Sequence, residues 1–116
     1  MSVTIYHHPK CTSSLLALDL IRQAGIEPTI IEYLVTPPTR EKLKELIKAL
    51  GIKPRGLLRQ NEKVYEKLNL ADPKWSDDQI IDFMLKNPIL INRPIVITPK
   101  GTVLARPGDK VKPFLR

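Results

Sequence analysis

The sequence has few cysteines and no long apolar segment, and each shortage excludes a class of protein. Cys11 is the only cysteine among 116 residues, so the chain cannot form an internal disulfide framework, and we expect a reducing cytoplasmic compartment. No apolar run approaches the roughly 20 residues that a membrane-spanning helix needs. The N-terminus lacks the basic and apolar regions of a signal peptide. We therefore expect a cytoplasmic protein with no membrane partner.

Aromatic residues are also scarce, and this limits the interpretation of the charge. The chain holds one Trp, three Tyr and two Phe, and its formal net charge is +7. So few aromatic rings form no obvious platform for stacked bases. Lysines and glutamates alternate between Arg40 and Lys48 at the spacing of a solvated helix face. We expect no nucleic-acid partner, and an attraction for small anions accounts for the excess of positive charge.

Metal-binding residue types are equally sparse. Cys11 and the adjacent His7 and His8 do not supply the four ligands of a usual zinc site. We expect neither a metal nor a bound cofactor.

The order of the segments indicates a mixed α/β fold in one domain covering residues 1–116. The pattern predicts strands at residues 3–6, 28–34, 95–98 and 102–105, and helices at 12–24, 40–50 and 76–87. The first strand, helix and strand form a βαβ unit, which implies parallel pairing. The last two strands form an antiparallel hairpin, followed by a terminal helix or coil at 107–116. A helical insertion is expected at about residues 39–90.

Cys11 lies in a short loop between a strand and a helix. The first amides of such a helix point toward the sulfur, and the helix N-terminus carries partial positive charge. An ordinary cysteine ionises near pH 8.5, and the thiolate is the nucleophile. The alternative is a buried, inert thiol, but the flanking Pro9, Lys10, Thr12 and Ser13 indicate no apolar pocket. A reactive thiol is therefore favoured. If the segment before it is extended, His7 and His8 point to opposite faces, and only one readily approaches the sulfur.

Three isolated arginines stand next to predicted elements. Arg59 follows two leucines, Arg93 precedes a strand, and Arg106 follows the last strand. The planar guanidinium fork suits tetrahedral oxyanions. For any one of them a surface or salt-bridged arginine is the simpler interpretation, but three together with a thiolate favour an oxyanion site. The Arg93-Pro94 bond precedes a strand, and the sequence alone does not decide whether it is cis.

Ordered blocks of sequence carry a family resemblance. They are Ile5-Tyr6-His7-His8-Pro9-Lys10-Cys11, the segments 27–34, 55–59, 78–84 and 87–96, and Arg106-Pro107. In this order they resemble the glutaredoxin-coupled arsenate reductase family, whose fold is thioredoxin-like. The resemblance covers nearly the whole chain, which ends soon after the last block, as in shorter members of the family. It also implies a cis bond before Pro94.

The resemblance implies a function and a set of site residues. Cys11 would attack arsenate, and two further catalytic residues would stand beside it: His7 would help to tune the thiolate, and Ser14 would lie close to the nucleophile. The oxyanion would be held by three arginines: Arg59, Arg93 and Arg106. Glutathione would act as co-substrate and glutaredoxin would clear the mixed disulfide, which agrees with the lack of a second cysteine because an external thiol must then resolve the intermediate. We expect a monomer.

Two positions depart from the family pattern, and two alternatives stay open. Leu15 stands where members usually carry an arginine, and His8 stands where asparagine is common. One alternative is a glutathione-linked thiol oxidoreductase that acts on another substrate. The other is a non-enzymatic regulator like Spx, many of which use a Cys-x-x-Cys switch. Here Ser14 occupies the second cysteine position of that switch.

Overall fold

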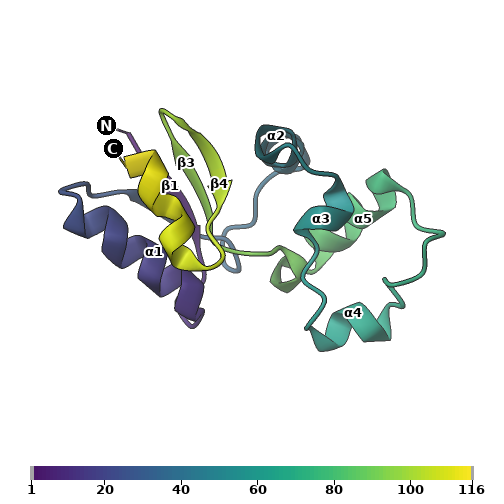
Figure 1. Ribbon diagram of the computed structural model, residues 1–116. Helices are drawn as coiled ribbons and strands as arrows, with labels where there is room; N and C mark the ends of the chain where they lie inside the picture. Colours follow the sequence, from purple (N-terminus) through teal and green to yellow (C-terminus); the bar gives the residue numbers. More distant parts are fainter. Residues whose placement is uncertain (1, 116) are drawn as a thin grey trace. The chain divides into compact units, whose positions relative to one another are not determined.

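The computed structural model describes residues 2–115, and these residues form two compact units (Figure 1). The first unit combines residues 2–36 with 93–115, and the second unit contains residues 37–92. Within the described residues, no helix has the length and apolar character needed to cross a membrane.

The first unit is built on a mixed sheet of four strands. They are β1 (Thr4–His7), β2 (Thr29–Glu32), β3 (Ile95–Thr98) and β4 (Gly101–Leu104), in the order β2-β1-β3-β4. Strand β1 pairs in parallel with β2 and antiparallel with β3, and β3 pairs antiparallel with β4. The expected βαβ unit, hairpin and mixed α/β class are confirmed.

The register of β1 and β2 places their carboxyl ends together. Thr4 pairs with Thr29, and His7 pairs with Glu32. Because parallel strands run in the same direction, the loops that follow them leave from one edge of the sheet. The loop after β1 carries Cys11, so the residues that follow β2 lie at the same edge.

Helix α1 (Thr12–Gln23) and the 3-10 helix η2 (Gly108–Leu115) pack against each other beside the sheet (Figure 1). Alternation along β1 points Val3 and Ile5 into this layer, and His7 is the next residue on that face. The buried cluster contains Val3, Ile5, Ala17, Leu18, Ile21, Val96, Ala105 and Val111. Complete burial of one large aliphatic side chain contributes about 1.5–3 kcal/mol, so this cluster holds helix, strands and η2 together.

Gly108 brings η2 close to the backbone of α1. A Cβ at this position would lie 2.5 Å from the Ser13 carbonyl oxygen and 2.9 Å from the Ala17 nitrogen. Only a residue without a side chain permits this approach. The sequence predicted either helix or coil for this terminal segment, and the structure shows a 3-10 helix seated on the first turns of α1.

The second unit is helical. It contains α2 (Arg40–Leu50), α3 (Pro54–Leu57), α4 (Lys63–Lys67), α5 (Asp77–Lys86) and η1 (Pro88–Leu90). The Thr39 hydroxyl accepts the Lys42 N–H, and α2 ends at Gly51 in the left-handed conformation. Both features agree with the expected helix at residues 40–50. Leu43, Leu46 and Ile47 on α2 and Ile80, Ile81 and Met84 on α5 are buried.

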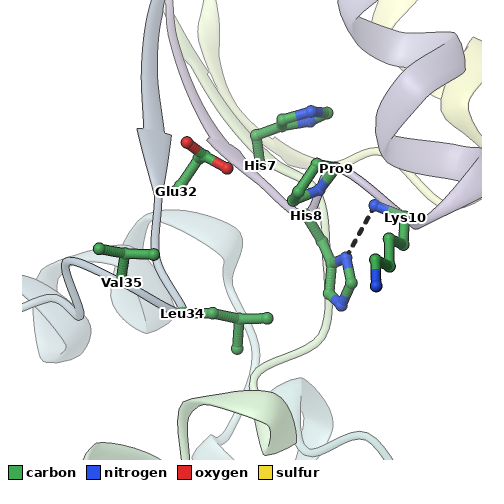
Figure 2. Close-up of a pocket in the computed structure, with 7 residues that line it drawn as sticks. All are labelled: His7, His8, Pro9, Lys10, Glu32, Leu34 and Val35. Carbon is green, nitrogen blue, oxygen red and sulfur yellow. Dashed lines mark hydrogen bonds between the residues drawn. The ribbon is translucent and has the colours of Figure 1, made fainter.

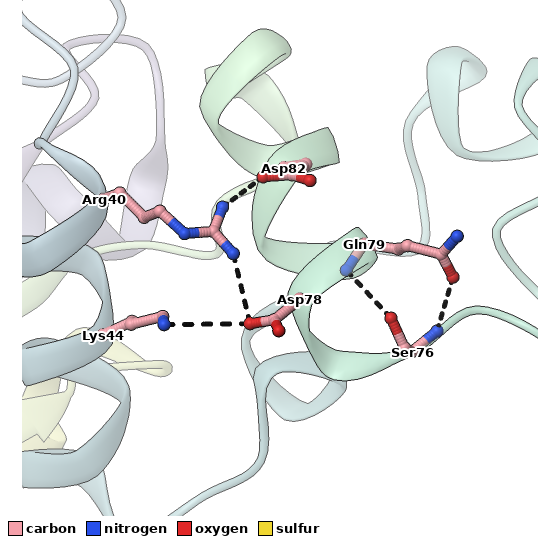
Figure 3. A network of polar contacts seen from close by, with 6 residues as sticks. All are labelled: Arg40, Lys44, Ser76, Asp78, Gln79 and Asp82. Carbon is pink, nitrogen blue, oxygen red and sulfur yellow. Dashed lines mark hydrogen bonds and ion pairs between the residues drawn. The ribbon is translucent and has the colours of Figure 1, made fainter.

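Polar contacts join α2 to α5 on the surface (Figure 3). The Arg40 guanidinium bonds to Asp78 at 3.1 Å and also to Asp82, and Lys44 lies 3.7 Å from the Asp78 carboxylate. Ser76 and Gln79 form a capping box at the start of α5, because the Ser76 hydroxyl accepts the Gln79 N–H while the Gln79 side chain accepts the Ser76 N–H. The start of α5 is thus fixed by sequence-local bonds.

Candidate active site

Cys11 is the N-cap residue of α1 and is partly buried. A tight turn leads into it, because the Cys11 N–H donates to the His8 carbonyl at 3.1 Å. The Leu15 N–H donates to the Cys11 carbonyl at 2.9 Å, which begins the helix. The loop and the helix start therefore hold the sulfur in front of the first-turn amides, as the sequence indicated.

The surroundings of Cys11 favour the thiolate. Burial raises the pKa of the thiol, but hydrogen bonding from the Ser14 and Ser13 backbone amides lowers it, and the Arg93 side chain lowers it further through a hydrogen bond and its charge. The lowering effects prevail, so the pKa of Cys11 lies below its ordinary value. A depressed pKa gives more thiolate at neutral pH and hence a better nucleophile.

Two of the three predicted arginines lie at this thiol. The Arg106 Nη1 donates to the Cys11 sulfur at 3.6 Å. Arg93 is only 5% exposed, and it acts on the same sulfur as described above. Each is followed by a cis proline bond, Arg93-Pro94 and Arg106-Pro107. The first cis bond was expected from the resemblance, and the second was not foreseen.

His7 and Ser14 form a buried pair at the end of β1. The His7 Nδ1 lies 2.5 Å from the Ser14 Oγ, and this oxygen also accepts the His8 N–H at 3.1 Å. Burial is the largest influence on His7 and lowers its pKa. The Glu32 charge raises this pKa and the Arg22 charge lowers it, and the pKa remains below its ordinary value. Because a neutral imidazole is favoured, the serine hydroxyl can accept from His8 and donate to His7. Ser14 also supplies the backbone amide that stabilises the thiolate.

His8 takes the opposite direction, as the alternation of an extended segment predicts. Its Nδ1 accepts the Lys10 backbone N–H at 3.1 Å (Figure 2). With Nδ1 an acceptor, the proton of a neutral ring lies on Nε2. His8 thus contributes to the shape of the loop, and His7 is the histidine that contacts the serine on α1.

A pocket of about 340 Å³ opens beside this loop (Figure 2). The loop after β1 supplies one wall, and β2 with the turn that follows it supplies the other. Its lining residues are His7, His8, Pro9, Lys10, Glu32, Leu34 and Val35. Sequence reasoning missed Glu32, Leu34 and Val35. The parallel pairing of the first two strands was the available signal, because it brings the ends of both strands to one edge.

Arg59 belongs to the second unit. Its backbone N–H donates to the Leu90 carbonyl at 2.7 Å, and its Nε donates to Glu62 at 2.9 Å. Both bonds are made within that unit. The structure therefore brings Cys11, His7, Ser14, Arg93 and Arg106 together in the first unit and defines the local setting of Arg59.

Within residues 2–115, no group of three or more His, Cys, Asp or Glu side chains is arranged to hold a metal ion.

Comparison with known proteins gives this arrangement a family. A sequence profile of the ArsC family matches residues 6–114. The chain is 56% identical to an arsenate reductase of Escherichia coli strain K12 over 98% of its own length and 81% of the relative's. It is 48% identical to an arsenate reductase of Rhizobium meliloti over 99% of its length and 82% of the relative's.

A solved structure extends the comparison to the fold. The structure of an arsenate reductase from Vibrio cholerae matches with a TM-score of 0.94 and 42% identity, covering 98% of each chain. The thioredoxin-like fold implied by the resemblance is thereby confirmed. Three findings agree. The family profile matches nearly the whole sequence, one relative is more than half identical, and a solved structure has the same fold. This chain belongs to the ArsC family.

Proposed function

We propose that the protein is an arsenate reductase in which Cys11 is the nucleophile. The observation that carries this proposal is the Cys11 sulfur, held at the start of α1 with a lowered pKa and with Arg106 3.6 Å away. A thiolate beside guanidinium groups suits a reaction with a small oxyanion. Membership of the ArsC family and relatives named arsenate reductase support arsenate as that oxyanion.

Arg93 and Arg106 would bind the arsenate oxygens, with Arg59 as the third arginine of the set. Cys11 sulfur would form a bond to arsenic while an arsenic–oxygen bond breaks and the oxygen leaves as water after taking up protons. Ser14 and His7 would act by holding the loop and the first turn of α1, because their contact joins the end of β1 to that turn. Negative charge near the sulfur would be balanced by the two guanidinium groups.

A second thiol is needed to finish the reaction, and the chain has no other cysteine. We propose glutathione for this step and glutaredoxin for the next. The glutathione sulfur would bond to the Cys11 sulfur, and the electron pair of the sulfur–arsenic bond would stay on arsenic. Arsenic(V) becomes arsenic(III), and arsenite leaves while two thiols are oxidised to one mixed disulfide. Glutaredoxin would reduce that disulfide and restore Cys11. A reducing cytoplasm supplies these thiols.

The test is a coupled assay with glutathione, glutaredoxin, glutathione reductase and NADPH. We expect NADPH oxidation that depends on arsenate, and we expect Cys11→Ser to abolish it. Ser13→Ala keeps the backbone amide next to the sulfur and serves as the matched control, with activity close to the parent. Absence of arsenate-dependent oxidation would overturn the proposal. Glutathionylation of Cys11 without any response to arsenate would point instead to a thiol oxidoreductase of another substrate.

A further inference from the structure

None of the arginines proposed to bind the oxyanion lines the pocket beside the Cys11 loop. Its volume of about 340 Å³ lies at the lower end of the range for small-molecule sites. Arsenate is too small to fill it, and the Glu32 carboxylate on its wall would repel an anion. The pocket therefore suits a larger ligand that also carries a positive group.

The lining offers one cation, one anion and an apolar wall. Among the residues that the structure describes, neither Lys10 nor Glu32 forms a salt bridge. Leu34 is 38% exposed and Val35 is 80% exposed, so two apolar side chains face solvent at the pocket. This combination is complementary to a short peptide, which carries carboxylates, an ammonium group and apolar methylene groups.

The position of the pocket also fixes how a bound peptide would relate to the thiol. Lys10 lines the pocket and directly precedes Cys11 in the chain, and consecutive Cα atoms lie about 3.8 Å apart. An extended tripeptide spans roughly 10 Å. A peptide thiol seated here therefore has the reach to bring its sulfur to Cys11.

We propose that this pocket binds glutathione, with Lys10 contacting a carboxylate, Glu32 contacting the α-ammonium group, and Leu34 and Val35 covering the peptide. The proposal rests on the proposed function, which requires a thiol reductant. It separates two substrates in space: the arginine side of Cys11 receives the oxyanion, and the Lys10 side receives the reductant.

Binding can be measured without any turnover. The probe is S-methylglutathione, which cannot form a disulfide, titrated into the Cys11→Ser protein and followed by amide chemical shifts. We expect saturable shifts at Lys10 and at residues 32–35. Val35→Trp, which fills the pocket, should weaken binding about tenfold or more, and Glu32→Lys should weaken it about threefold or more. Ile30→Trp and Asp19→Lys are matched controls outside the lining and should leave binding unchanged.

Steady-state kinetics of the parent and the variants complete the test. Val35→Trp should raise the KM for glutathione about tenfold while the KM for arsenate stays constant. Shifts that avoid residues 32–35, or an unchanged KM for glutathione in both pocket variants, would overturn the pocket assignment. A rise in the KM for glutaredoxin alone would also overturn it and would assign the surface to the protein partner. A failure of the proposed function would give a different result. The protein would then show no arsenate-dependent turnover but would still bind S-methylglutathione.

Discussion

The Nη1 of Arg106 lies 3.6 Å from the sulfur of Cys11, although 95 positions of sequence separate the two residues. Arg106 lies two residues after β4 and Cys11 directly precedes α1, so the sheet and the helix start together produce the contact. A cation at this distance favours the thiolate and offers donors to an incoming oxyanion. The contact gives the site its charge complementarity.

Replacing Arg106 with lysine should weaken the binding of arsenate. A lysine keeps the charge but loses the planar fork that bonds two oxygens at once. We expect the KM for arsenate to rise about tenfold, as measured in the coupled assay. Arg40→Lys, a surface change in the second unit, should leave that KM unchanged. Equal values for the parent and Arg106→Lys would exclude a role for the fork.

Replacing Arg93 with methionine should raise the pKa of Cys11. The Arg93 side chain lowers the pKa of this thiol by a hydrogen bond and by its charge, and methionine supplies neither. The rate of alkylation by iodoacetamide, followed against pH, should have its midpoint at higher pH than in the parent. Lys110→Met removes an exposed charge elsewhere and should not move the midpoint. A profile unchanged by Arg93→Met would contradict the charge argument.

Removal of the Ser14 hydroxyl should reduce stability. Ser14 is completely buried, and its Oγ contacts the His7 Nδ1 and accepts the His8 N–H. Ser14→Ala leaves these partners unsatisfied, which costs about 1–3 kcal/mol when buried. The free energy of unfolding from urea titration measures the loss. Ser13→Ala should change it by about 0.5 kcal/mol or less, and an equal effect of the two changes would argue against the His7–Ser14 pair.

The protein should lose stability in mild acid through His7. The pKa of His7 lies below its ordinary value of 6.5, mainly because the side chain is buried. As the pH falls through 6.5, the unfolded chain takes up a proton before the folded protein does, so the free energy of unfolding decreases. The decrease ends once the pH is below the folded pKa. Urea midpoints between about pH 7.5 and pH 5.5 should fall less steeply in His7→Gln than in the parent.

Gly108→Ala should separate η2 from α1. The added Cβ would meet the Ser13 carbonyl oxygen at 2.5 Å, which no rotamer can relieve. Overpacking of this kind costs about 1–3 kcal/mol, measured as a lower thermal midpoint. Gly56→Ala is the control, because its Cβ would meet only the Ile52 side chain, at 3.3 Å or more. A similar midpoint for both variants would mean that η2 moves without cost.

Local patterns in the sequence predicted much of the fold. The helix ends at Thr39, Gly51 and Ser76 are capped by hydrogen bonds or backbone angles within a few residues. These caps therefore follow from local chemistry. The hairpin of β3 and β4 is likewise local. The order of the strands and the seat of η2 on α1 depend on distant partners, and no local pattern encodes them.

The candidate site was likewise predicted in part from local patterns, and the rest of it depends on distant contacts. The position of Cys11 at the start of α1 follows from its neighbours, and alternation predicted that His7 and His8 diverge. The setting of Arg93 and Arg106 at the thiol was implied by family resemblance, since their approach is a tertiary contact. The pocket at Leu34 and Val35 was missed because exposed apolar residues after a strand carry no distinctive pattern. Cys11 itself does not line this pocket, although its neighbours Pro9 and Lys10 do.

The packing of Gly108 against the first turns of α1 links the thiol to a distant part of the sequence. Cys11 directly precedes α1, and Arg106 lies two residues before η2. The contact between α1 and η2 therefore helps to hold the Arg106 guanidinium at the Cys11 sulfur, and Val111 fixes η2 in the buried cluster. The hydrophobic core thereby contributes to the chemistry of the site, because apolar packing sets the separation between the cation and the thiol.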